Sequence, residues 1–113
     1  MSVLVTNLLR ALPSPPSQEL FDRLVETDAF LLERIVSFGH TSEPGQWYDQ
    51  EREEWVLLLS GRARLRFEQP ACVVELVPGD SLRIAAHCRH RVEWTEPGRE
   101  TVWLALHFGA RGA

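Results

Sequence analysis

Residues able to do chemistry gather in two short segments of the chain. Residues 48–54 read Tyr-Asp-Gln-Glu-Arg-Glu-Glu, and residues 87–90 read His-Cys-Arg-His. Carboxylates and imidazoles transfer protons or bind metal ions, and one nitrogen with two oxygens suits Fe, Mn, Ni or Zn better than Cu(I). A catalytic pair of Cys88 with His90 would need hydrogen-bond reach and an orienting third group. We therefore favour proton or metal chemistry over a cysteine nucleophile.

Both segments belong to motifs that resemble those of the cupin family, which are small β-barrels of the jelly-roll type. Six residues separate Glu54 from Gly61, as in the second half of the first cupin motif. In the second motif, the turn Pro78-Gly79-Asp80 is followed by a short strand, a loop and His90. His90 falls on the family's metal-binding histidine. The resemblance extends over about residues 30–108.

The resemblance implies that ligands from facing strands converge at the mouth of the barrel. It gives Gln50, Glu54 and His90 as the metal ligands, and a divalent transition metal (Fe, Mn, Ni or Zn) as the cofactor. This set is weaker than three histidines, so its occupancy is expected to be partial or absent. Glu54 and Tyr48 are the catalytic candidates that handle protons. A longer spacing within the motif would place Asp49, in place of Gln50, at the site.

Two function classes follow from these residues. The first is a metal-dependent enzyme of the oxygenase, isomerase or lyase type that acts on a small polar molecule. The second is a non-catalytic module that binds or senses a small ligand and has a degenerate metal site. A third class is a structural dimer whose barrel is filled by its own side chains. The loss of the paired histidines favours the second class, whereas retention of Glu54 and His90 favours the first.

The elements that must position these residues are short strands. Apolar runs of four to eight residues alternate with Gly, Pro and Asp turns, which is typical of a sandwich or a small barrel. Expected strands are Phe30–Phe38, Trp55–Leu59, Ala63–Phe67, Val73–Val77, Ser81–Ile84, His90–Trp94 and Thr101–Phe108, with a shorter one around Trp47–Gln50. The fold class is therefore all-β, a small single cupin barrel of the jelly-roll type.

A different pattern precedes the strands. Three prolines at residues 13–16 force an extended link. Ser17 is then placed to cap one short helix, Gln18–Glu26, whose apolar face carries Leu20, Phe21 and Leu24. We therefore predict an N-terminal arm and short helix over residues 1–28 and a cupin β-barrel over residues 29–113.

Two further histidines and a row of arginines have structural explanations. His107 shares a strand face with Trp103, so it either lines the cavity or belongs to an interface. For His87, a solvent-facing or loop-bracing role before the site is expected. Arginines at 62, 64 and 66 share one strand face, and we expect them to form ion pairs across the sheet, with no bound anion; the candidate partners are Glu68, Glu75 and Glu93.

The composition of the chain limits the classes of molecule that it is expected to bind. The chain has 113 residues, a net charge of −4 and no lysine, which excludes a lysine Schiff base and argues against nucleic acid or anionic membranes as partners. Two cysteines are too few for a disulfide scaffold, and no convincing signal peptide is present, so we expect a cytoplasmic protein. The apolar segment Val3-Leu4-Val5 needs cover. We therefore predict a homodimer whose ligand is a small molecule.

Overall fold

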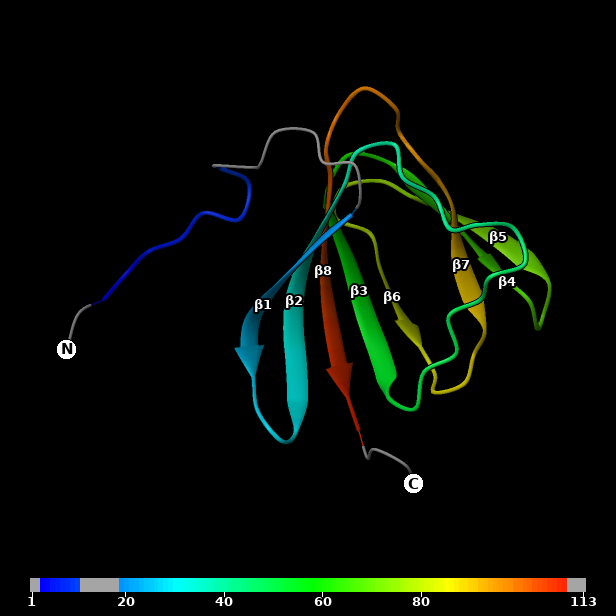
Figure 1. Ribbon diagram of the computed structural model, residues 1–113, viewed down its shortest axis with the longest axis horizontal. Coiled ribbons are helices and arrows are strands. Elements are labelled where there is room, and N and C mark those ends of the chain that lie inside the picture. The colour runs from blue at the N-terminus through cyan, green and yellow to red at the C-terminus, as the bar shows by residue number, and fades with distance from the viewer. Residues whose placement is uncertain (1–2, 11–18, 110–113) are drawn as a thin grey trace.

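The computed structural model describes residues 3–10 and 19–109, and every regular element within them is a β-strand. Eight strands form two antiparallel sheets that face each other (Figure 1). Their bounds are β1 Leu20–Glu26, β2 Phe30–Ser37, β3 Glu53–Ser60, β4 Ala63–Phe67, β5 Cys72–Leu76, β6 Ser81–Ile84, β7 His90–Thr95 and β8 Thr101–Phe108. This architecture confirms the all-β barrel that we expected from the sequence.

The two sheets differ in size. The larger has the strand order β1-β2-β8-β3-β6, and the smaller has the order β5-β4-β7. The seven longer strands expected from the sequence all form, three of them with the predicted bounds. The short strand predicted around residues 47–50 is reduced to one bridge, in which Tyr48 pairs with His90. This bridge ties the segment that precedes β3 to the start of β7.

Alternation along β3 decides which of its residues face the interior. In β3, Glu54, Val56 and Leu58 are buried, whereas the residues between them are partly exposed. Strand side chains alternate between the two faces of a sheet, so a glutamate in the buried set must point between the sheets. The apolar members pack into one core cluster, comprising Val56, Leu58, Ala63, Leu65, Leu76, Ile84 and Trp103.

The helix predicted over residues 18–26 is wrong. Ser17 and Gln18 lie outside the described residues, and residues 20–26 form β1, which pairs with β2 along the edge of the larger sheet. The register shifts between Arg23 and Val25. Such a bulge breaks the two-residue alternation of a strand, and Leu24 of the predicted apolar face lies at this shift. Pairing with β2 overrides the local preference, and Arg34 adds a 3.0 Å hydrogen bond from Nε to Asp22.

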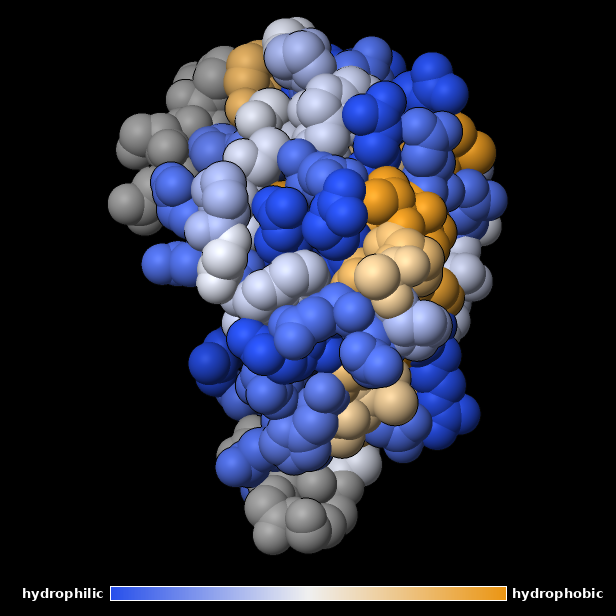
Figure 2. Space-filling view, turned by 90° about the vertical axis from the view of Figure 1, so that its right-hand side faces the viewer, coloured by the Kyte–Doolittle hydropathy of each residue, from blue (hydrophilic) through white to orange (hydrophobic). Residues whose placement is uncertain are grey.

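Two of the three arginines in this row, Arg64 and Arg66, form the ion pairs that we expected, whereas Glu68 pairs with Arg89. Arg64 pairs with Glu75 of β5 at 2.9 Å, and Arg66 pairs with Glu93 of β7 at 2.7 Å. Arg64 also lies over the ring of Trp94, 4.7 Å from its centroid. Figure 2 views the molecule from this side, where hydrophilic residues cover most of the surface. The outer face of the small sheet is therefore a solvated surface of paired charges.

A glycine makes the turn between β3 and β4. Gly61 has a φ of +86°, and a Cβ built on it would lie 2.7 Å from the Cα of Thr101. Only glycine adopts this backbone conformation without strain and leaves room for the neighbouring strand. This turn joins the two sheets just beyond the β3 residues that point inward. Among the described residues there is no helix long and apolar enough to cross a membrane.

Candidate functional site

A cavity between the two sheets contains all four residues that the sequence singled out. Tyr48, Gln50, Glu54 and His90 line it together. About 70 Å³ is open to water-sized molecules, several times the roughly 10–15 Å³ that one buried water needs. Much of the wall is apolar, including Ile35, Val56, Leu65, Ile84, Val92 and Trp103.

His90 is buried, and its ring is held in one orientation. The side chain comes from the first residue of β7, and the residue is 6% exposed. Its Nδ1 lies 2.8 Å from the carbonyl oxygen of Cys88, which can only accept a hydrogen bond. Nδ1 therefore carries a proton, and Nε2 is the ring atom left for the cavity. Cys88 thus contributes its backbone to the site.

Glu54 faces His90 across the cavity. Oε1 of Glu54 lies 3.5 Å from Nε2 of His90, and the glutamate residue is 7% exposed. That Oε1 accepts no hydrogen bond from the described part of the chain. Burial lowers the pKa of His90, but the carboxylate of Glu54 and the Cys88 carbonyl outweigh this effect, so the pKa of His90 is raised above its usual value. Glu54 and His90 are therefore a buried acid–base pair, and Oε1 of Glu54 remains available to accept a hydrogen bond from a bound molecule.

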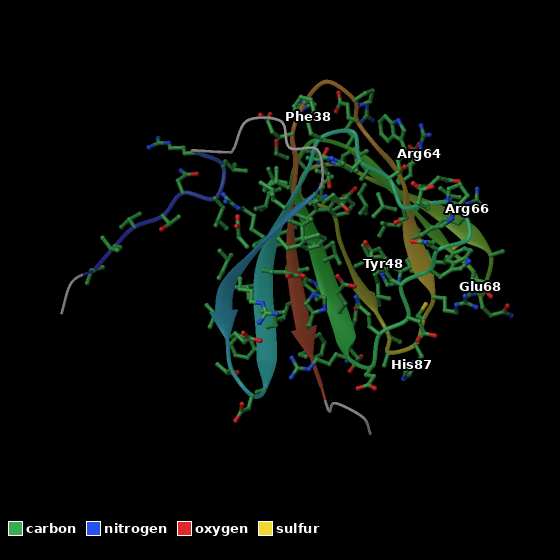
Figure 3. All side chains as sticks on the ribbon, in the orientation of Figure 1. Phe38, Tyr48, Arg64, Arg66, Glu68 and His87 are labelled. Atoms are coloured by element: carbon green, nitrogen blue, oxygen red, sulfur yellow. The ribbon has the colours of Figure 1, made fainter. Side chains whose placement is uncertain are left out.

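Tyr48 and Gln50 come from the irregular segment before β3. The backbone N–H of Tyr48 donates to the carbonyl of His90 at 2.7 Å, and the N–H of His90 donates back at 3.2 Å. Figure 3 shows Tyr48 between the sheets, and its side chain is part of the cavity mouth, because the residue is 39% exposed. Burial and nearby Glu19 raise the pKa of the Tyr48 phenol. The phenol therefore remains protonated and can donate a hydrogen bond.

The position of Asp49 settles which neighbour faces the site. Oε1 of Gln50 is buried in the cavity wall and accepts no hydrogen bond from the described residues. Asp49 instead pairs with the exposed His87 at 2.7 Å, outside the cavity. The backbone N–H of His87 also donates to the Gln50 carbonyl at 2.8 Å. His87 therefore braces the loop before His90, in the role that the sequence predicted for it.

A second acid–base pair lies in the same cavity and was missed by the sequence analysis. Nε2 of His107 on β8 lies 2.9 Å from Oε1 of Glu33 on β2, and both side chains are mostly buried. Their hydrogen bond raises the pKa of His107 above its usual value, against the effect of burial. His107 also stands directly opposite Glu54 in the β3–β8 ladder. Of the two alternatives left open for His107, the structure selects the cavity wall.

The donor set was tested for a metal ion. Two donors about 2.1 Å from one ion in tetrahedral geometry would be about 3.4 Å apart, so the 3.5 Å between Glu54 and His90 is suitable for shared ligation. However, no three His, Cys, Asp or Glu side chains in residues 3–10 and 19–109 are grouped to hold a metal. The third donor would be the weaker amide oxygen of Gln50. The predicted set therefore has two strong donors and one weak donor, and metal binding by these residues stays a prediction.

Comparison with known proteins identifies the family. A family model described as the cupin domain matches residues 36–107. The chain belongs to the cupin family. Cupin barrels often hold a metal ion or a small ligand between their sheets, which is where this cupin has its cavity. No curated protein matches the chain.

Solved structures agree with this assignment. A candidate mannose-6-phosphate isomerase from Ralstonia eutropha is 42% identical, with a TM-score of 0.90, and the alignment covers 96% of this chain and 100% of that one. A cupin superfamily protein from Desulfitobacterium hafniense is 20% identical, with a TM-score of 0.71 and the same coverage. The polyketide cyclase RemF from Streptomyces resistomycificus is 19% identical, with a TM-score of 0.70, covering 86% and 69% of the two chains. At 20% and 19% identity, the Desulfitobacterium and Streptomyces structures show only that the fold is shared.

Proposed function

We propose that this cupin binds a small polar molecule in its cavity and that Glu54 and His90 exchange a proton with it. The observation that carries the proposal is the buried Oε1 of Glu54, which accepts no hydrogen bond from the described residues. A buried acceptor without a partner costs about 1–3 kcal/mol, so a donor from a bound molecule would stabilise it. His90 lies close enough to share that molecule.

Proton transfer is the chemistry that the pair supports. Nδ1 of His90 is fixed by the Cys88 carbonyl, so the ring can take or release a proton only at Nε2. Glu54 stabilises the protonated ring, and Tyr48 at the mouth supplies a hydrogen-bond donor. Reactions that move a proton on a small molecule, of the isomerase or lyase type, use an acid and a base of this kind.

The rival proposal is a ligand-binding module without turnover. The incomplete metal donor set favours it over a metal-dependent oxygenase. Elemental analysis of untagged protein separates these alternatives. A stoichiometric transition metal that is lost in both Glu54→Ala and His90→Ala would replace the proton-transfer proposal with the metal site predicted at Gln50, Glu54 and His90.

Mannose 6-phosphate, the substrate class in the name of the Ralstonia protein, is not favoured by the residues that line this cavity. Phosphate is bound by arginine, lysine or a helix N-terminus. None of the residues that line the cavity is an arginine, the chain has no lysine, and the described residues contain no helix. A phosphate group would instead meet the carboxylates of Glu33 and Glu54. We therefore do not propose this substrate.

The test of the proposed function is a ligand-detected NMR screen of uncharged, anionic and cationic polar molecules. Glu54→Gln and His90→Gln are expected to weaken the best ligand roughly tenfold or more, since losing a charged hydrogen bond costs about 1.5–3 kcal/mol. Glu75→Gln is the matched control, because Glu75 lies on the outer face of the small sheet, where it pairs with Arg64. The ligand is also incubated with the protein in deuterated water. Exchange of a carbon-bound hydrogen for deuterium would indicate an enzyme, and no exchange would indicate a binding module. Unchanged affinity in both cavity variants would contradict the site.

The exposed arm supports a homodimer. Val3, Leu4 and Val5 are 86–95% exposed and run away from the body of the molecule (Figure 1). Apolar segments of this kind are stabilised by burial against a partner, and a two-fold dimer is the commonest arrangement. Light scattering is expected to give twice the chain mass of 12.9 kDa. Replacing Val3, Leu4 and Val5 with serine is expected to weaken the dimer. A monomer at micromolar concentration would refute this prediction.

A further inference from the structure

The charged groups of the cavity do not balance. Three carboxylates line it, from Glu19, Glu33 and Glu54, together with the imidazoles of His90 and His107. No arginine is among the lining residues. Counted over the lining residues alone, one negative charge is left over with both imidazoles protonated, and three with both neutral; the buried Arg52 acts on His107 from outside the lining. In an environment with apolar walls such a charge attracts a cation strongly.

The three carboxylates differ in what they bind. Glu33 is paired with His107 at 2.9 Å, and Glu19 accepts a hydrogen bond from the hydroxyl of Ser37. Glu54 is the least satisfied, since its buried Oε1 accepts no hydrogen bond from the described residues and lies 3.5 Å from Nε2 of His90. Oε1 of Gln50 is a second buried oxygen that accepts no hydrogen bond from the described residues. Two acceptors without donors are complementary to a ligand that brings several N–H groups.

Aromatic rings complete a site for a positive charge. Phe21 and Tyr48 lie at the mouth, 54% and 39% exposed, and Trp103 forms part of the inner wall. The faces of such rings attract ammonium groups. Glu19 and Tyr48 also line a second, more polar hollow of about 270 Å³, which has Glu43 and Trp47 in its wall. A cation at the mouth therefore has room for a polar extension.

We propose that the ligand of this cavity is a small organic cation that carries an amine, held by the unpartnered oxygens of Glu54 and Gln50 between carboxylates and aromatic rings. This inference rests on the proposed function, because it names the class of molecule that the cavity binds. It excludes ligands whose only charged groups are phosphate or carboxylate. An ammonium group meets both needs of the cavity, because it donates hydrogen bonds and carries the missing positive charge.

The test uses three molecules of one shape and different charge: n-butylamine, n-butanol and butyrate. Each is titrated into EDTA-treated full-length protein near pH 7, where an alkylamine is protonated, and binding is followed by calorimetry and by NMR. Butylamine is expected to bind roughly tenfold or more tightly than butanol, and butyrate most weakly, because like charges disfavour association. Glu54→Gln is expected to reduce the ratio of butylamine to butanol affinity toward one, whereas Glu75→Gln leaves it unchanged.

Each outcome decides the inference. Butanol or butyrate binding as tightly as butylamine overturns the amine ligand and leaves the proposed function standing. Failure of all three to bind also overturns it, and the wider ligand screen then decides the proposed function separately. An amine preference that persists in Glu54→Gln would place the cation elsewhere and overturn the assignment to this cavity.

Discussion

Replacing Gly61 with alanine is expected to lower the free energy of unfolding by roughly 2–5 kcal/mol. Two costs add. The residue has a φ of +86°, where a side chain is strained, and the new Cβ would lie 2.7 Å from the Cα of Thr101 and 2.9 Å from the carbonyl oxygen of Glu100. These are backbone atoms of the segment that enters β8, so they cannot move aside as a flexible side chain would.

Gly98 provides the matched control for this prediction. It has a φ of +81°, and a Cβ there would meet no atom within 4 Å. Gly98→Ala is therefore expected to cost only about 1 kcal/mol, the price of the backbone conformation alone. Urea denaturation of both variants measures the difference. Equal losses at Gly61 and Gly98 would show that β3, β4 and β8 are not packed as described.

The second large effect is a pH-dependent loss of stability in Glu33→Gln. At about pH 6, removal of the carboxylate that pairs with His107 is expected to lower the free energy of unfolding by roughly 1–3 kcal/mol. At about pH 9 the loss should be smaller, because the neutral ring can still hydrogen bond to the glutamine that replaces it. Glu54 and Arg52 also act on His107, with opposite effects on its pKa, and both remain in the variant.

The direction of this effect follows from proton binding. The pKa of His107 is raised in the folded protein, so its contribution to stability is fully present below the unfolded value of about 6.5 and is lost as the pH rises through the folded pKa. The pKa of His90 is shifted in the same direction. The wild-type protein should therefore be more stable at about pH 6 than at about pH 9, and Glu33→Gln should reduce the difference. Parallel stability curves for the two proteins would contradict the pairing.

Strands and their inward faces could be predicted from the sequence, because alternation is a local signal. The bounds of Ala63–Phe67, Ser81–Ile84 and Thr101–Phe108 match those of β4, β6 and β8. Glu54 occupies an inward position of β3 between apolar neighbours, and the motif spacing indicated that His90 would face it. Where two-residue alternation and turn glycines agree, the local sequence determines the fold.

What could not be predicted depends on contacts between distant segments. Glu33 and His107 are 74 residues apart and meet only because β2 and β8 pair. A signal was present, since a glutamate at an inward position of β2 requires a buried partner, but the partner could not be chosen without the strand order. The error at β1 has a related cause, since its bulge and its pairing with β2 are properties of the assembled sheet.

The double hydrogen bond between the backbones of Tyr48 and His90 has a consequence for engineering this barrel. Tyr48 at the cavity mouth and His90, the residue proposed to transfer a proton, are joined through their backbones, so a shift of one backbone is expected to shift the other. An insertion or deletion near Tyr48 is therefore expected to displace the His90 ring as well, so that ligand selectivity and the proposed proton transfer would change together. A designer who wants a new specificity should therefore exchange side chains at position 48 and leave the length of the loop alone.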